Sequence, residues 1–199
     1  MLLMTSDSAL WYFAYGANMN PAVFIERRGS VQVARDRGCL KGYRLVFDRP
    51  GIPLLEPAFA NLESDPHSEV WGLLWRISAE ALGRLDKQEG GGAYARLPVE
   101  VQGDEVGMVS AITYQAGRTL SGLRPSRRYL DVILNGARAA QLPEDYVSAL
   151  SRTSAHDIPF GHVVSPIALR FFERCFVAGI DVKRLFDRYW DFVARRRSK

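Results

Sequence analysis

The sequence predicts an α+β fold in which short strands come first and helices follow. Several apolar or alternating segments between residues 12 and 114 have the composition of β-strands, with one short helix among them. From Pro125 onward the apolar residues recur at helical spacing instead. This order favours a small mixed sheet or barrel over a doubly wound α/β fold, in which strands and helices would alternate throughout.

The length and composition are those of a globular protein with one domain. Of the 199 residues, 47% are hydrophobic and 24% are charged, and a chain of this length buries roughly 70% of its unfolded surface. Cys39 and Cys175 lack metal-ligand spacing, so we interpret them as reduced thiols of a cytoplasmic protein. No apolar run approaches about 18 residues, and residues 1–10 lack a basic segment. We therefore expect neither a membrane span nor a signal peptide.

The net charge of +4 is concentrated at the C-terminus. Residues 183–199 carry a balance of +5, and the rest of the chain carries −1. A basic end such as residues 195–199 can contact nucleic acid, but a solvated terminus is its ordinary behaviour. We expect no nucleic-acid partner and keep binding through this tail as an alternative.

The first predicted element is a buried strand that leads through a tight turn into a helix. Residues 12–15 are apolar and aromatic, Gly16 interrupts them, and Asn20 can cap a helix that begins at Pro21 and covers about residues 21–28. Such a turn can direct backbone N–H groups at a carboxylate or an oxyanion, and Gly16 permits a close approach or a positive φ. The alternative is an ordinary core strand followed by a turn.

The middle of the chain is predicted to hold strands, one long loop and one helix. Strands are expected at residues 43–47, 70–77, 94–101 and 108–114. Residues 48–69 contain four prolines and are predicted to form a long loop. Ser78 is the expected N-cap of a short helix that three glycines, at residues 90–92, bring to an end.

The C-terminal part is predicted to be helical. Helices are expected over about residues 126–141, 144–151, 166–176 and 181–194. The last of them carries an apolar stripe formed by Leu185, Phe186, Tyr189, Trp190 and Val193. We interpret this stripe as core or as a partner-facing surface, with no cofactor.

Glu89 is the candidate for acid–base chemistry. It follows a predicted helix and lies between two predicted core strands. Burial there would raise its pKa toward neutrality, which suits a group that takes and returns a proton; the alternative is an exposed glutamate at a helix end. The three histidines are isolated and no common nucleotide or hydrolase motif is present, so we expect no metal and no cofactor.

Taken in order, these segments resemble the γ-glutamylcyclotransferase family, which has the AIG2-like fold. Residues 12–18, followed by Arg27, resemble its opening loop. The next matches resemble the family's strand, its catalytic glutamate and its following strand, and they are residues 70–75, 85–90 and Tyr94, in that order. The last matches resemble the family's late helical part, and they are residues 125–129, 135–137 and 142–146. The resemblance covers about residues 11–150.

The resemblance implies a small β-barrel of about five to seven strands with peripheral helices. Residues 1–199 would form this single domain, and residues 155–199 would be a C-terminal helical extension. The implied reaction is attack of a γ-glutamyl α-amine on its own γ-carbonyl, which forms 5-oxoproline and releases an amine or amino acid. The implied site residues are Glu89 as general acid and base, with substrate binding by Tyr12, Tyr15, Gly16, Ala17, Asn18, Tyr94 and Tyr129. For Tyr94 and Tyr129, a purely structural place in the core stays an alternative.

One departure from the family pattern is Ala17, which stands where a serine is usual. If only the backbone N–H at this position is needed, Ala17 serves, which is the interpretation we favour. The departure also motivates an alternative function, a non-catalytic carboxylate-binding module on the same fold. The sequence does not identify the leaving group, although the loop looks less like that of the glutathione-specific branch, and a homodimer is compatible with it.

Overall fold

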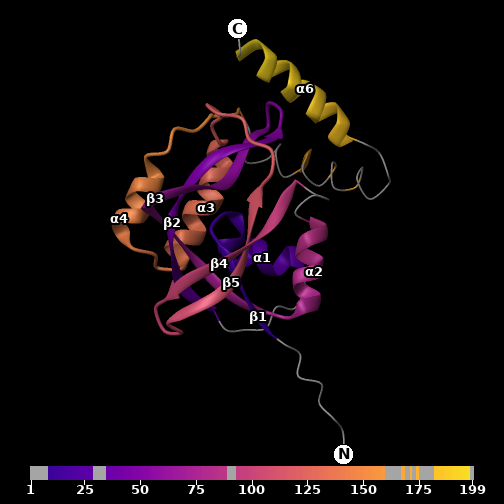
Figure 1. Ribbon diagram of the computed structural model, residues 1–199. Helices are drawn as coiled ribbons and strands as arrows, with labels where there is room; N and C mark the ends of the chain where they lie inside the picture. Colours follow the sequence, from indigo (N-terminus) through magenta and orange to yellow (C-terminus); the bar gives the residue numbers. More distant parts are fainter. Residues whose placement is uncertain are drawn as a thin grey trace, which may run out of the picture. The chain divides into compact units, whose positions relative to one another are not determined.

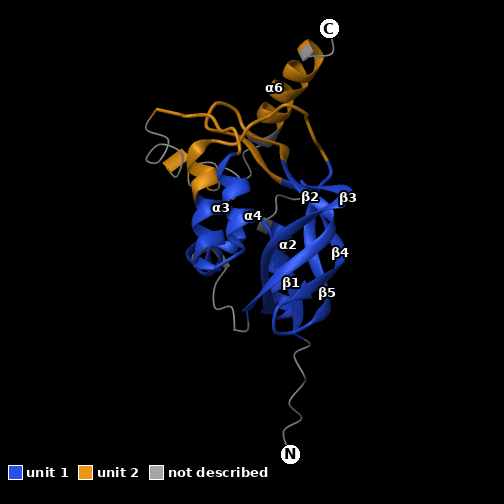
Figure 2. Cartoon of the chain, turned by 90° about the vertical axis from the view of Figure 1, so that its left-hand side faces the viewer, with its two compact units in different colours: residues 1–46, 61–117, 132–152 blue, residues 47–60, 118–131, 153–199 orange. Residues whose placement is uncertain are grey.

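The computed structural model shows an α+β protein (Figure 1). It describes residues 9–28, 35–88, 93–159, 167, 168, 171, 174 and 182–197. The chain divides into two compact units, coloured separately in Figure 2. The first unit comprises residues 1–46, 61–117 and 132–152, and the second comprises residues 47–60, 118–131 and 153–199. The division into one domain with an extension from residue 155 stays a prediction.

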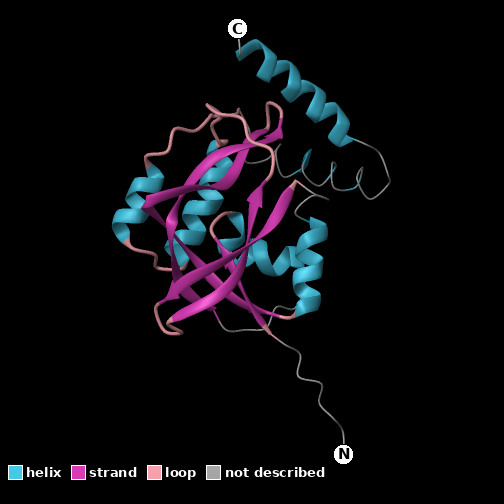
Figure 3. Cartoon of the chain, viewed as in Figure 1, coloured by secondary structure: helices cyan, strands magenta, loops and turns pink. Residues whose placement is uncertain are grey.

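Five strands of the described chain close into a barrel, in the order β1–β3–β2–β4–β5 (Figure 3). Their bounds are β1 Leu10–Ala14, β2 Arg35–Ile52, β3 Glu56–Ile77, β4 Tyr94–Gly103 and β5 Met108–Ala116. Strand β1 is antiparallel to β3 and parallel to β5, and β4 is antiparallel to both β2 and β5. The predicted α+β fold with a mixed barrel is confirmed.

Helices follow or interrupt these strands. Their bounds are α1 Pro21–Arg28, α2 Ala79–Gln88, α3 Arg127–Ala139, α4 Glu144–Ser151 and α6 Val182–Arg197. The side-chain oxygen of Asn20 accepts the N–H of Ala22 at 3.1 Å, and that of Ser78 accepts the N–H of Ala81 at 3.2 Å. Both predicted N-caps are therefore confirmed. Most of the helix expected at residues 166–176 lies outside the described residues.

The prediction of a long loop at residues 48–69 is wrong, because this segment forms the turn of a β-hairpin and the adjoining parts of its two strands. Strand β2 continues to Ile52 and β3 begins at Glu56, joined by a short turn in which Leu54 has a φ of 66°. Alternate residues Glu56, Ala58 and Ala60 are buried, which is the period of a strand. The prolines in this segment led to the prediction of a loop. A proline lacks the N–H that would donate a hydrogen bond to the neighbouring strand, but it is compatible with an extended backbone.

The core of the first unit is apolar and contains one described cysteine. Phe13, Leu74 and Ile133 are almost completely buried there. The Cys39 thiol is unpaired and buried, and burial, reinforced by a hydrogen bond to Glu69, raises its pKa to about 12. The thiol is therefore protonated at neutral pH. Cys175 lies outside the described residues.

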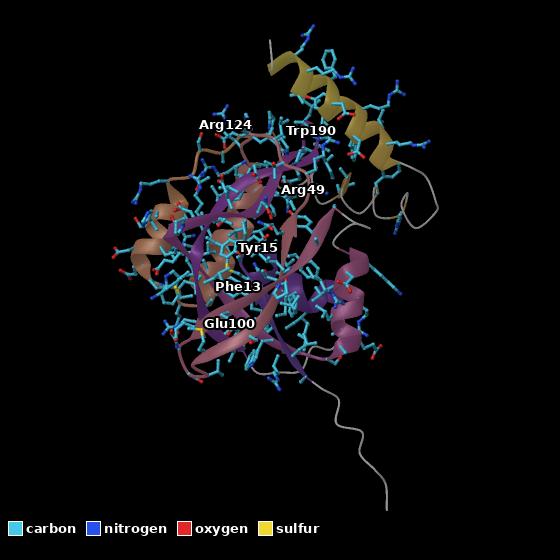
Figure 4. All side chains as sticks on the ribbon, in the orientation of Figure 1. Phe13, Tyr15, Arg49, Glu100, Arg124 and Trp190 are labelled. Carbon is cyan, nitrogen blue, oxygen red and sulfur yellow. The ribbon has the colours of Figure 1, made fainter. Side chains whose placement is uncertain are left out.

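Within the second unit, α6 is held by polar contacts. The indole N–H of Trp190, which is labelled in Figure 4, donates to the carbonyl of Gly51 at 2.8 Å. Arg118 pairs with both Asp187 and Asp191. Only part of the predicted apolar stripe is covered, since Leu185 remains 64% exposed. No described helix is both long enough and apolar enough to cross a membrane.

Candidate active site

The chain passes from β1 to α1 through one tight turn. Residues 17–19 form one turn of 3-10 helix, in which the N–H of Met19 donates to Gly16 and that of Asn20 donates to Ala17. The amide of Ala17 heads this turn, where an N–H has no partner within the helix. Gly16 has a φ of −114°, so its use here is close approach rather than a positive φ. Such an amide at a helix start favours negative charge.

Aromatic side chains hold the turn in place. The hydroxyl of Tyr12 accepts the side-chain N–H of Asn18 at 2.8 Å, and the indole of Trp75 donates to the Asn18 carbonyl at 3.2 Å. Phe24 of α1 stacks on both rings, with centroids 5.7 Å from Tyr12 and 4.7 Å from Trp75. Asn18 is thus fixed through both its side chain and its backbone.

Tyr15, the last residue before the turn, is anchored to β5. Its side chain is buried among the strands, near Phe13 (Figure 4). Its hydroxyl donates to the carbonyl of Tyr114 at 2.6 Å, and the ring of Tyr114 meets that of Tyr12 edge to face at 5.9 Å. Tyr114 is therefore a common support for both tyrosines that flank the strand end.

Helix α3 touches the backbone of the turn at Gly136. A Cβ at this position would lie 2.8 Å from the amide nitrogen of Asn20 and 3.0 Å from the carbonyl carbon of Met19. Both atoms belong to the backbone, so they cannot move aside as a flexible side chain could. Gly136 is required because only glycine permits this approach.

We expect Gly136→Ala to destabilise the protein by about 1–3 kcal/mol, the usual cost of overpacking. The matched control is Gly83→Ala in α2, because nothing lies within 4 Å of a Cβ there. That change should stabilise the protein by about 0.5–1 kcal/mol, the helix preference for alanine. Urea unfolding of both variants measures the difference, and equal stability of Gly136→Ala and wild type would contradict the close approach.

At the C-terminal end of α2, Asp86 forms an ion pair with Arg96 and also contacts Tyr114. One carboxylate oxygen of Asp86 accepts the hydroxyl of Tyr114 at 2.7 Å and Nε of Arg96 at 2.9 Å, and Arg96 also reaches the second oxygen. These hydrogen bonds, first from Arg96 and then from Tyr114, hold the pKa of Asp86 below its usual value. Asp86 is consequently a carboxylate at neutral pH.

Most of the predicted loop residues lie together in the structure. The predicted acid–base residue is not among the residues that the structure describes. Tyr12, Tyr15, Gly16, Ala17 and Asn18 form one continuous feature, the strand end and its turn. Glu89 lies outside the described residues, as does the Arg27 side chain. Tyr94 is the first residue of β4, is half-buried and pairs with Ala116 of β5.

Tyr129 has the surroundings of a core residue in the second unit. It is buried, and its ring packs edge to face against Phe47 and Phe59, with centroids 6.4 and 5.1 Å away. Its hydroxyl accepts the N–H of Ala60 at 3.3 Å. These contacts account for its burial, and a role toward a ligand stays a prediction.

Sequence reasoning missed four supporting residues: Trp75, Asp86, Tyr114 and Gly136. Trp75, Asp86 and Gly136 were inside matched motifs, but no supporting role was predicted for them. The partners of Asp86 lie 10 and 28 residues away. The contact of Gly136 with Asn20 spans an even longer stretch of chain. Within the part of the chain that the structure describes, no three His, Cys, Asp or Glu side chains are grouped to hold a metal ion.

Several known proteins that are similar to this chain in sequence and fold are named γ-glutamylcyclotransferases. A model of the AIG2-like family matches residues 69–150. The γ-glutamylcyclotransferase of Bos taurus is 31% identical over 154 residues, which cover 73% of this chain and 79% of that protein. The human γ-glutamylcyclotransferase is 28% identical, with coverage of 76% and 82%. A solved γ-glutamyl cyclotransferase structure matches with a TM-score of 0.69 at 26% identity, over 75% of this chain and 90% of that one.

Proposed function

This chain belongs to the γ-glutamylcyclotransferase family of enzymes, and we propose that it converts a small γ-glutamyl substrate into 5-oxoproline. The observation that supports the proposal is the tight turn at residues 16–19, in the segment that resembles the family's opening loop. The similar proteins are named for this reaction. The alternative of a non-catalytic binding module, which Ala17 motivated, is not favoured by these relatives and is not proposed.

The reaction begins with proton transfer from the substrate. The α-ammonium group, with an ordinary pKa of about 8, must lose a proton before its nitrogen can attack. Glu89 accepts that proton as general base. The nitrogen then forms a bond to the γ-carbonyl carbon, and the carbonyl oxygen becomes an oxyanion. This attack closes a five-membered ring within one molecule, so the enzyme's main task is to hold the substrate in the folded geometry.

The turn stabilises the charge that develops on the oxygen. Backbone N–H groups at Gly16 and Ala17 donate to the oxyanion, a role in which one fixed donor contributes a factor of about 10²–10³ in rate. A backbone donor does not depend on the side chain, so the absence of serine at Ala17 leaves this function intact. Tyr12, Tyr15 and Asn18 hold the turn through the contacts described above.

The intermediate collapses when Glu89 returns the proton. The bond from the γ-carbon to the leaving nitrogen breaks as that nitrogen is protonated. The ring nitrogen gives up its second proton, which ends on the released amine or amino acid as its ammonium group, and 5-oxoproline departs. No water is consumed, and the glutamate ends in its starting state. Tyr94, the first residue of β4, is proposed to contact the substrate, and a role toward the substrate is proposed for Tyr129 as well. The buried, unpaired thiol of Cys39 supports a reducing, cytoplasmic setting.

The test is a panel of γ-glutamyl amino acids and γ-glutamylamines incubated with the wild-type protein. We expect 5-oxoproline to appear by mass spectrometry together with an equal amount of one leaving group, whose mass identifies the preferred substrate. A non-γ-glutamyl control, such as an α-glutamyl dipeptide, should give no free 5-oxoproline, because its amide is on the α-carbonyl, where attack by the α-amine would close a three-membered ring. Failure to release 5-oxoproline from every member, by protein shown to be folded, would contradict the proposal.

A further inference from the structure

Helix α6, in the second unit (Figure 2), has apolar side chains on a side that its own unit leaves uncovered. Leu185, Tyr189 and Phe192 are 64%, 39% and 54% exposed. Their spacing of four and three residues places them in one line along the helix, here called the outer apolar row. Trp190, in contrast, is buried and donates to the carbonyl of Gly51. The helix is therefore docked on one side and apolar on another.

Arginines accompany the outer apolar row. Arg188 and Arg195 are exposed, and each follows a member of the row, Leu185 or Phe192, by three residues, which puts it on the neighbouring line of the helix surface. Arg196 lies in the row itself, with its guanidinium carbon 4.8 Å from the centroid of the Phe192 ring. The apolar stem of an arginine can lie along such a row while its charged end stays in water.

The charge of this surface is positive, and so is that of its unit. The two aspartates among the described side chains of α6, Asp187 and Asp191, both pair with Arg118. In the sequence of the second unit, 14 Lys and Arg stand against eight Asp and Glu, a net charge of +6. The first unit has 12 against 14, a net charge of −2. The partner that fits the outer side of α6 is therefore both apolar and negatively charged.

A membrane that contains anionic lipids has this combination. Helices that lie in the plane of such a membrane place apolar side chains at the acyl boundary and arginines among the phosphate headgroups. A flat membrane contacts only the outer side of a helix, whereas a protein groove encloses more of it, and the side of Trp190 is already occupied. A second copy using the same surface would bring arginines against arginines, and a nucleic acid would leave the apolar row unused.

We propose that the second unit binds the surface of anionic membranes through the outer side of α6. Leu185, Tyr189 and Phe192 enter the interface, and the arginines beside them contact lipid phosphates. The helix lies along the surface and does not cross it. Each arginine near an anionic surface contributes roughly a fivefold factor in affinity, and this contribution falls as salt is raised. The inference goes beyond the proposed function and does not depend on it.

The test is sedimentation of the full chain with vesicles of phosphatidylcholine, alone or with about one-third phosphatidylserine. We expect binding to the anionic vesicles and affinity for the neutral ones that is weaker by about tenfold or more. Leu185→Ser with Phe192→Ser should lower the affinity for anionic vesicles about 10- to 100-fold, because less apolar area enters the interface. The matched control is Met108→Ser with Ile25→Ser, two side chains of the first unit that are 62% and 53% exposed. This control should bind as wild type does.

A second pair of variants tests the charge. Arg188→Gln with Arg195→Gln should lower the affinity for anionic vesicles roughly 25-fold, at about fivefold for each arginine. The control, Arg138→Gln with Arg152→Gln, removes the same charge from exposed positions of the first unit and should have a much smaller effect. Circular dichroism and melting temperature show that each variant is folded.

Three results would overturn the inference. In the first, wild type does not bind anionic vesicles, or binds neutral ones equally well. In the second, the serine variant of α6 keeps wild-type affinity while the glutamine variant loses it, which would indicate a general surface for polyanions. In the third, wild type sediments without lipid as a dimer that Leu185→Ser with Phe192→Ser dissociates, which would assign the outer apolar row to contact between two copies of the chain.

Discussion

Replacement of Glu89 by glutamine is expected to lower kcat for 5-oxoproline release by about 10²–10⁴-fold, the usual contribution of a general acid–base group. Glutamine has nearly the same size and can still accept a hydrogen bond, but it cannot take the ammonium proton at neutral pH. The substrate would then depend on its small fraction of free amine and on water to protonate the leaving nitrogen. KM should change little, because in the proposed mechanism the carboxylate moves a proton and does not hold the substrate.

The matched control is Glu80→Gln, in the same helix that leads to Glu89. Glu80 is 83% exposed and pairs with Arg84, one turn away, so this change should leave kcat unaltered. Both variants are assayed by mass spectrometry after circular dichroism has shown that each is folded. A Glu89→Gln protein with near wild-type turnover would show that another group moves the proton, even if the panel of substrates confirms the reaction.

The parts of this site that depend on local chemistry could be predicted from the sequence. Asn20 and Ser78 cap their helices because a short polar side chain reaches amides two or three residues further along the same chain. The strand at residues 70–77 was found because its apolar run is continuous, although it proved to be the last part of a longer strand. In each case the determining contacts lie within one element.

The parts that depend on distant partners could not be predicted. The hairpin tip was missed because its buried face is formed by Glu56 and two alanines, none of which is typical of strands. In the sequence, Gly136 is only a residue with a low helix propensity, and its close contact with the backbone of Asn20 becomes evident in the structure. Asp86 resembles one more charge at a helix end until Tyr114 and Arg96 are placed beside it. The sequence pattern carries no signal for these pairings.

A buried ion pair in the second unit illustrates the same point. Glu56 of β3 is completely buried, and its two carboxylate oxygens accept the hydroxyl of Ser126 and, at 2.6 Å, the Nε of Arg128. The Arg128 side chain is only 15% exposed. Ser126 also accepts the N–H of Tyr129 at 3.0 Å, at the start of α3. Glu56 therefore satisfies two polar groups that water cannot readily reach.

Glu56→Ala is expected to destabilise the protein by about 3–5 kcal/mol, because it leaves a buried guanidinium without its counter-charge. The matched control is Glu63→Ala, also in β3 and also paired with an arginine, Arg44, but 47% exposed; its cost should be about 1 kcal/mol or less. A double variant, Glu56→Leu with Arg128→Met, should recover most of the loss, since apolar residues can replace a buried pair at little cost. Urea unfolding measures all three. If Glu56→Ala is no worse than Glu63→Ala, or if the double variant is the least stable, the buried charge is not the cause of the effect.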